Sequence, residues 1–263
     1  MISIISGVYN AEGTLRAALD SILAQTCSDW EYIICDDAST DGTAEILREY
    51  SSRDARFRVM RNDRNLGLAA SLNRCITFVR GEYIARMDGD DISLPERFEK
   101  QLSYLQSHPE TDAVGCWMKT FGGEVDETVR KDEIPTKYLL PKEAPFHHAT
   151  VMMKAETMKK LGGYKVAPST LGTEDVELWN RFFAEGHTGY NIGEVLYHVR
   201  VDDGAIKRRK FSRYLRYSKI IREGVKMNRL PLRYNIYCLK PILSFFLPEG
   251  LKRNHRQRKA SSR

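Results

Sequence analysis

Apolar residues in the first third of the chain alternate between short continuous runs and helically spaced groups. Runs such as 3–8 and 31–35 have the length of buried strands, whereas Leu15, Leu19 and Ile22 recur at the spacing of one helix face. The same succession of strand and helix occurs three times in this part. It predicts an α/β fold in which helices flank a mixed, mostly parallel sheet.

The predicted elements follow one another closely. We expect strands at 3–8, 31–35, 57–60 and 82–87, and helices from Leu15 to Leu23, from Thr43 onward, over 68–79 and from Ser93 to Gln106. The last helix begins with Ser93 and Glu96 in the pattern of a capping box. The middle of the chain, 107–206, is less regular, apart from a helix that follows Glu174 and Asp175.

Polar clusters stand directly after three of the predicted strands. These clusters are Tyr9-Asn10, Asp36-Asp37 and Asp88-Gly89-Asp90-Asp91. Open α/β sheets bind ligands beyond the carboxyl ends of their strands. We therefore expect three segments that are distant in sequence to line one crevice.

The acidic run 88–91 gives the sharpest chemical indication. Its three carboxylates repel one another unless a cation lies among them, and Mg²⁺ and Mn²⁺ prefer oxygen ligands. Gly89 permits a tight turn. The alternative is a solvated acidic turn, but its position after an apolar strand favours a metal site.

Other charged residues have a functional and a structural interpretation each. Asp36 and Asp37 would accept hydrogen bonds from a nucleoside, or lie in a turn where Ser39 or Asp41 caps the next helix. A carboxylate of the Glu174-Asp175 pair would take a proton from a hydroxyl group, or would only stabilise the first turn of the helix through the helix dipole.

The basic candidates also have a functional and a structural interpretation each. Arg200 would pair with a diphosphate, or lie at the surface. His147 and His148 are metal or acceptor contacts in one interpretation and structural in the other, and we favour the structural one.

Six short segments, taken in order, resemble glycosyltransferase family 2, the inverting group with the GT-A architecture. The segments are 3–10, 36–43, 65–69, 81–91, 162–164 and 173–175. Each is weak alone, but their order and spacing are specific. The resemblance covers about 2–206 and implies a GT-A fold, a nucleotide-diphospho-sugar donor and a divalent metal, Mn²⁺ or Mg²⁺.

The resemblance also implies roles for individual residues. The nucleotide sugar would be bound by Tyr9, Asn10, Asp36, Asp37, Asn65, Gly67, Asp88 and Arg200. Asp88 and Asp90 would hold the metal. Asp175 would be the catalytic base, with Glu174 beside it. One departure concerns a histidine that many relatives carry near the end of the domain, because Asp202 stands there and His198 comes earlier.

The implied function is a metal-dependent inverting glycosyltransferase. It would move a sugar, with UDP as the default nucleotide, to a hydroxyl group of a glycan or lipid-linked acceptor in bacterial surface polysaccharide synthesis. A sugar nucleotidyltransferase is one alternative, but the segment 7–12 lacks the basic, glycine-rich phosphate loop that it needs. A catalytically inactive protein that only binds a sugar nucleotide is the other.

Basic residues are concentrated at one end of the chain. Residues 207–263 contain 18 basic and 2 acidic residues, a net charge of +16, whereas 1–206 contain 23 and 33, a net charge of −10. We therefore divide the chain into a GT-A domain, 1–206, with a nucleotide-binding half at 1–95 and an acceptor half at 96–206, and a basic helical C-terminal appendage, 207–263.

This appendage suggests a location. Its apolar stretch 236–247 is too short and too broken to span a bilayer, but it would lie in the interface, and its basic residues would bind anionic lipid. Five cysteines without a C-x-x-C pair, and no signal peptide, indicate the reducing cytoplasm. We expect a peripheral enzyme on the inner face of the membrane. The alternatives are a solvated appendage packed on the acidic body and, less favoured, nucleic-acid binding.

Overall fold

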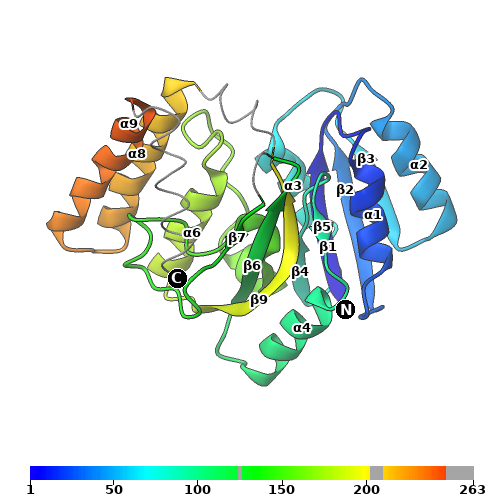
Figure 1. Ribbon diagram of the computed structural model, residues 1–263, viewed down its shortest axis with the longest axis horizontal. Helices are drawn as coiled ribbons and strands as arrows, with labels where there is room; N and C mark the ends of the chain where they lie inside the picture. The colour runs from blue at the N-terminus through cyan, green and yellow to red at the C-terminus, as the bar shows by residue number, and fades with distance from the viewer. Residues whose placement is uncertain (124–125, 202–209, 247–263) are drawn as a thin grey trace.

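A computed structural model describes residues 1–123, 126–201 and 210–246. One mixed sheet runs through this part of the chain (Figure 1). Its first half consists of parallel strands in the order β3-β2-β1-β4. Their bounds are Ile2–Val8 (β1), Trp30–Asp36 (β2), Phe57–Arg61 (β3) and Tyr83–Arg86 (β4).

The second half of the sheet begins where β8 pairs with β4 in the antiparallel direction. The order then continues β6-β9-β5, with β7 beside β6. The bounds are Met152–Lys154 (β8), Ala113–Phe121 (β6), Gly189–Arg200 (β9), Ile92–Ser93 (β5) and Thr128–Val129 (β7). Because the long pairs, such as β6 with β9, are parallel, the predicted mixed and mostly parallel sheet is confirmed.

Helices cover both faces of the sheet and enclose two hydrophobic clusters. Ile4 of β1 faces the cluster under α1, α2 and α4, and its neighbour Ile5 faces the cluster under α3, α5 and α6. The bounds are Leu15–Leu23 (α1), Thr43–Arg53 (α2), Leu68–Ile76 (α3), Arg97–Ser107 (α4), Ala155–Lys160 (α5) and Glu174–Ala184 (α6).

Two predicted helix boundaries are wrong. The helix at 68–79 ends at Ile76. Ser93 does not cap a helix, because it is a buried residue of β5 and its N–H donates to Ser21 Oγ at 3.1 Å. The helix begins at Arg97 instead, with Glu96 as its N-cap residue, and the Glu96 side chain makes no capping hydrogen bond. Pairing of β5 with β9 therefore overrides the local capping pattern.

The described part of the appendage, 210–246, packs on the body rather than standing apart. It comprises α8 (Phe211–Met227), the 3₁₀ helix η2 (Leu232–Cys238) and α9 (Leu239–Phe246). Asn180 of α6 donates to the carbonyl of Ile220 at 3.2 Å and accepts from Asn228 at 3.0 Å. Figure 1 shows α8 and α9 side by side at the outer edge, beyond α6. None of the helices in the described ranges is long and apolar enough to cross a bilayer.

Candidate active site

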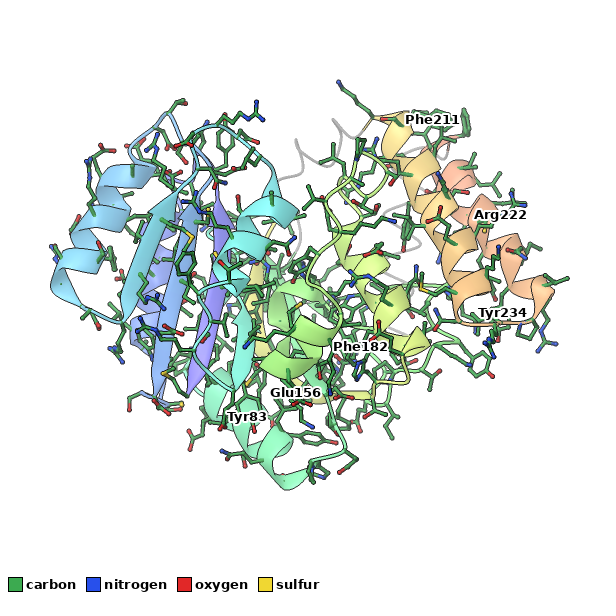
Figure 2. All side chains as sticks on the ribbon, turned by 180° about the vertical axis from the view of Figure 1, so that it is seen from behind. Tyr83, Glu156, Phe182, Phe211, Arg222 and Tyr234 are labelled. Atoms are coloured by element: carbon green, nitrogen blue, oxygen red, sulfur yellow. The ribbon has the colours of Figure 1, made fainter. Side chains whose placement is uncertain are left out.

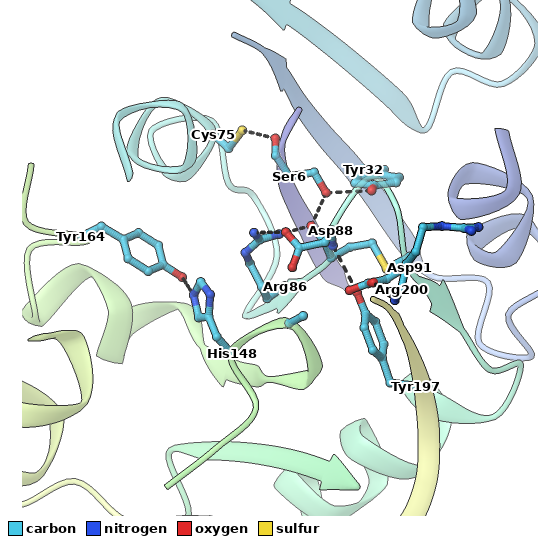
Figure 3. Close-up of polar contacts among 12 residues, drawn as sticks. Ser6, Tyr32, Cys75, Arg86, Asp88, Asp91, His148, Tyr164, Tyr197 and Arg200 are labelled. Atoms are coloured by element: carbon cyan, nitrogen blue, oxygen red, sulfur yellow. Dashed lines mark hydrogen bonds and ion pairs between the residues drawn. The ribbon is translucent and has the colours of Figure 1, made fainter. Parts of the chain in front are cut away.

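The acidic turn 88–91 follows β4 and is fixed from two sides. The Asp88 N–H donates to the Tyr197 hydroxyl at 3.1 Å, and the Gly89 carbonyl accepts from Thr14 Oγ1 at 3.1 Å (Figure 3). A side chain at Gly89 would lie 2.7 Å from Val8 Cγ1, so the turn approaches β1 too closely for any other residue. The turn therefore sits at the carboxyl ends of β1 and β4, as the sequence predicts.

The three carboxylates of this turn have different surroundings. Asp91 is buried and accepts the Arg200 N–H at 2.8 Å, so it anchors the turn to β9. Asp88 is 32% exposed, and Asp90 lies at the surface. Partial desolvation raises the pKa of Asp90, and the charge of Asp88 raises it further. Asp88 and Asp90 are therefore the carboxylates that a ligand can reach.

These two carboxylates fit a divalent cation, because a cation would relieve their repulsion and oxygen is the ligand that Mg²⁺ and Mn²⁺ prefer. Within the described ranges, no group of three or more His, Cys, Asp or Glu side chains is arranged to hold a metal. A cation at Asp88 and Asp90 would thus need further oxygen ligands from a diphosphate or water.

Arg86 is a member of the site that the sequence analysis did not assign. Its guanidinium is 3% exposed and contacts both the Met87 carbonyl and the Asp88 carboxylate. Burial lowers the pKa of Arg86, but the charge and hydrogen bond of Asp88, together with Tyr164 and Tyr197, raise it overall. A charged residue within an otherwise apolar strand, directly before a D-x-D run, is the sequence signal that could have identified Arg86.

The carboxylates after β2 are occupied by the protein itself. Asp37 accepts from Asn62 Nδ2 at 2.7 Å and from the N–H groups of Leu66 and Gly67, each at 2.8 Å. It thereby fixes the turn in which Gly67 has a φ of +88°. The nucleoside role of Asp37 remains a prediction, and any such contact would have to use the remaining accepting capacity of the carboxylate.

The other predicted nucleoside residues lie at the same edge of the sheet. Asp36 accepts from the Ser39 N–H at 2.9 Å, and its second oxygen lies 3.0 Å from Arg61 as an ion pair without hydrogen-bond geometry. Asn10 Oδ1 accepts from the Thr40 N–H at 2.9 Å. The side chains of Tyr9 and Asn65 are exposed. Loops after β1, β2 and β3 are therefore brought together.

Asp175 lies in the first turn of α6 and is half-buried. Burial raises its pKa, the neighbouring Glu174 contributes, and Arg213 of α8 opposes. Glu174 accepts from the Gly172 N–H at 2.9 Å and so helps to fix the loop before the helix. Of the two predicted catalytic carboxylates, Asp175 has the environment of a base with elevated proton affinity.

Tyr164 connects Asp175 with the acidic turn. Its hydroxyl lies 2.8 Å from His148 Nε2 (Figure 3). Burial raises the pKa of Tyr164, Arg86 opposes this, and the charges of both Asp175 and Asp88 reinforce it. Tyr164 and His148 line a small cavity with Arg86, the ion-pair partner of Asp88, and with Leu178 and Trp179 of α6. The end of β4 and the helix that carries Asp175 therefore border the same cavity.

The remaining candidates have mostly structural contacts. Arg200 Nε donates to the Asp90 carbonyl at 3.2 Å, and its guanidinium lies 4.5 Å from the Phe121 ring centre. His147 Nε2 lies 3.3 Å from a backbone carbonyl. Burial and nearby Arg86 lower the pKa of His148 to about 3, so this imidazole is neutral. His198 lies in β9. Asp202 lies outside the described residues.

Comparison with known proteins agrees with this geometry. The family described as Glycosyl transferase family 2 matches residues 3–161, which is more than half of the chain. The chain belongs to this family. The match includes the loops after β1, β2 and β4, whereas Asp175 lies beyond it.

Relatives of this family 2 enzyme extend over almost its whole length. The putative glycosyltransferase EpsE of Bacillus subtilis is 41% identical over 98% of this chain and 94% of its own. The Escherichia coli enzyme UDP-Glc:alpha-D-GlcNAc-diphosphoundecaprenol beta-1,3-glucosyltransferase WfaP is 25% identical over 97% and 99%. The chain is therefore a glycosyltransferase.

A solved structure shows the same fold. The mannosyltransferase PcManGT of Pyrobaculum calidifontis, in complex with GDP-Man and Mn²⁺, superposes with a TM-score of 0.69 at 18% identity, over 90% of this chain and 67% of its own. The predicted GT-A fold is confirmed.

Proposed function

We propose that this enzyme moves a sugar from a UDP-sugar to a hydroxyl group of a glycan or lipid-linked acceptor, with inversion, in bacterial surface polysaccharide synthesis. The observation that carries the proposal is that Arg86, the ion-pair partner of Asp88, lines one cavity with Leu178 and Trp179 of α6, the helix whose first turn carries Asp175. In this arrangement the acidic turn would bind the diphosphate and Asp175 would accept the proton. The names of WfaP and EpsE support the donor, the acceptor class and the reaction type.

The nucleoside would bind at the loops after β1, β2 and β3. The ring of Tyr9 is 49% exposed and available to a base. Asn10, Asp36, Asp37, Asn65 and Gly67 would complete this part of the site. Asp37 would support this part of the site by fixing the N–H groups of the 65–67 turn. Arg200 would face the diphosphate.

Asp88 and Asp90 would hold Mn²⁺ or Mg²⁺, and the PcManGT complex with GDP-Man and Mn²⁺ supports this assignment. Such an ion supplies positive charge that stabilises the departing nucleoside diphosphate. The ion pair with Arg86 keeps the Asp88 carboxylate in place. Asp91 contributes by tying the turn to β9.

Asp175 would perform the proton transfer. As the acceptor oxygen attacks the anomeric carbon, Asp175 takes the hydroxyl proton and the bond to the diphosphate breaks on the opposite face. A carboxylate with a raised pKa is the stronger base. No covalent intermediate is needed.

The test is release of UDP from a panel of UDP-sugars in the presence of Mn²⁺. Slow hydrolysis of one donor, which Asp88→Asn abolishes and Ser107→Ala at the far end of α4 does not, would support the proposal. Incorporation of a sugar 1-phosphate and a nucleoside triphosphate into a nucleotide sugar would show a nucleotidyltransferase instead. Binding of a donor without turnover, with or without an acceptor, would identify an inactive relative.

A lipid-linked acceptor would place the enzyme on the cytoplasmic face of the membrane. The net charge of +16 in residues 207–263 supports attachment to an anionic surface. Of this segment, 207–209 and 247–263 lie outside the described residues, so the structural argument below uses only 210–246.

A further inference from the structure

Large apolar side chains stand exposed along η2 and α9, at the outer edge of the molecule. Within α9, the spacing of Leu239, Leu243 and Phe246 places them on one side of the helix, and Leu232 and Ile236 stand in the preceding turns of η2. The exposed fractions are 84% for Leu232, 67% for Ile236, 54% for Leu239, 63% for Leu243 and 70% for Phe246. We call this set the apolar face. A group of exposed large apolar side chains of this kind marks an interaction site.

The apolar face is not the side on which the segment folds. The opposite side of α9 packs on α8, where Phe245 lies 4.8 Å from Phe211 and 5.3 Å from Tyr214 between ring centres. Ser218 Oγ of α8 donates to the Cys238 carbonyl at 2.7 Å. These contacts hold α9 against α8, and the ring of Phe246, at the border of the two sides, also lies 5.8 Å from that of Phe211. The rest of the apolar face is left for a partner.

Positive charge accompanies the apolar face. Residues 210–246 contain nine basic residues and one acidic residue, Glu223. Figure 2 shows Arg222 and Tyr234 on this outer edge. Lysine and arginine around an apolar helix face, with tyrosine at its border, are typical of helices that lie in the interface of an anionic bilayer. The charge favours an anionic lipid surface over a neutral one or a second, equally basic copy of the chain.

The apolar face is rigidly connected to the catalytic helix. Asn180 joins α6 to α8 through Ile220 and Asn228. Arg216 Nε donates to the Leu171 carbonyl at 3.0 Å, just before the Asp175 turn. A surface that holds α9 therefore also fixes the position of Asp175.

We propose that the apolar face inserts into the interface of an anionic membrane, with basic residues of the outer edge such as Arg222 among the lipid headgroups. This deepens the proposed function, on which it rests for a membrane-borne acceptor. Insertion would hold Asp175 at a fixed height above the bilayer, where a lipid-linked hydroxyl group is presented.

The experiment is flotation of the full chain with two kinds of vesicle, phosphatidylcholine alone and phosphatidylcholine mixed with phosphatidylglycerol. We expect flotation with the anionic vesicles, and about a tenfold or greater loss of bound protein for Leu239→Gln/Leu243→Gln. Leu23→Gln is the matched control, because Leu23 is 43% exposed and belongs to α1, which lies on the opposite side of the molecule from α9 (Figure 1), and it should float as the wild type does. Thermal unfolding checks that both variants are folded.

Three results would overturn the proposal. The first is equal flotation of the double variant and the wild type on anionic vesicles. The second is equal binding to neutral and anionic vesicles. The third is a stable dimer of the wild type that the double variant converts to a monomer, because the apolar face would then bind a second copy. Failure of the proposed function is seen separately, as the absence of UDP release by the wild type without vesicles.

Discussion

Gly224 lies where α8 packs on α6, the helix that carries Asp175, and the substitution Gly224→Ala tests how tight that packing is. A Cβ atom at this position would lie 2.3 Å from Asn180 Oδ1 and 2.6 Å from both Cγ and Nδ2. The Asn180 amide is 3% exposed and donates to the Ile220 carbonyl, so it cannot move away and keep that bond. The new methyl group must displace one helix or the amide.

The magnitude follows from opposing contributions. Overpacking costs about 1–3 kcal/mol, and loss of the amide hydrogen bond costs about 1 kcal/mol. Alanine is more favourable than glycine within a helix by about 1 kcal/mol. We therefore expect a net destabilisation of about 1–3 kcal/mol, which lowers the Tm of a chain of this size by about 2–12 °C.

The assay is thermal unfolding with Gly13→Ala as the matched control, because a Cβ at Gly13 would meet no atom within 4 Å. The control should unfold within about 2 °C of the wild type. Adding Asn180→Ala to Gly224→Ala should relieve the overlap and make the double variant less unstable than the sum of its single variants. If Gly224→Ala unfolds at or above the temperature of the wild type, the close packing of α8 on α6 is refuted.

Three further predictions concern the chemistry. Asp175→Asn should abolish turnover and leave the Kd for UDP unchanged, and a normal rate in the variant would exclude this base. Because burial raises the pKa of Asp175 and only its ionised form accepts a proton, the kcat/KM of the wild type should fall with decreasing pH, at a midpoint above that of an ordinary aspartate. EDTA should stop UDP release and Mn²⁺ restore it, with activity after thorough chelation as the contrary result. Asp37→Asn loses acceptor capacity toward the 65–67 turn and should weaken UDP binding about tenfold in calorimetry, whereas unchanged affinity would separate that turn from the donor site.

The regular half of the fold was predictable because its signals are local. The strands β1, β2 and β4 are mostly apolar runs, and each is followed by one of the polar clusters that the sequence shows. The strand β5 was missed because its two residues are defined by pairing with Tyr197 and His198 of β9, far along the chain. A local capping pattern at Ser93 suggested a helix, and tertiary pairing prevailed.

In the candidate site, too, local features were predictable from the sequence and features set by distant contacts were not. The carboxylates were identifiable as residue types after strands, but their individual environments were not. That Asp91 anchors the turn, whereas Asp88 and Asp90 remain accessible, depends on Arg200 and Tyr197. The position of Tyr164 in one cavity with Arg86 and residues of α6 carried no sequence signal, because it results from packing between separate elements.

The dependence of the acidic turn on β9 has a consequence for biosynthesis. The Asp88 N–H and the Asp91 carboxylate are each bound by a residue 109 positions later in the chain. Contacts of such sequence separation form late, since they must await the emergence of the distant segment from the ribosome. A nascent chain that has released residues 1–91 thus carries every carboxylate of the turn without its supports, and the turn gains its fixed geometry only when Arg200 has emerged.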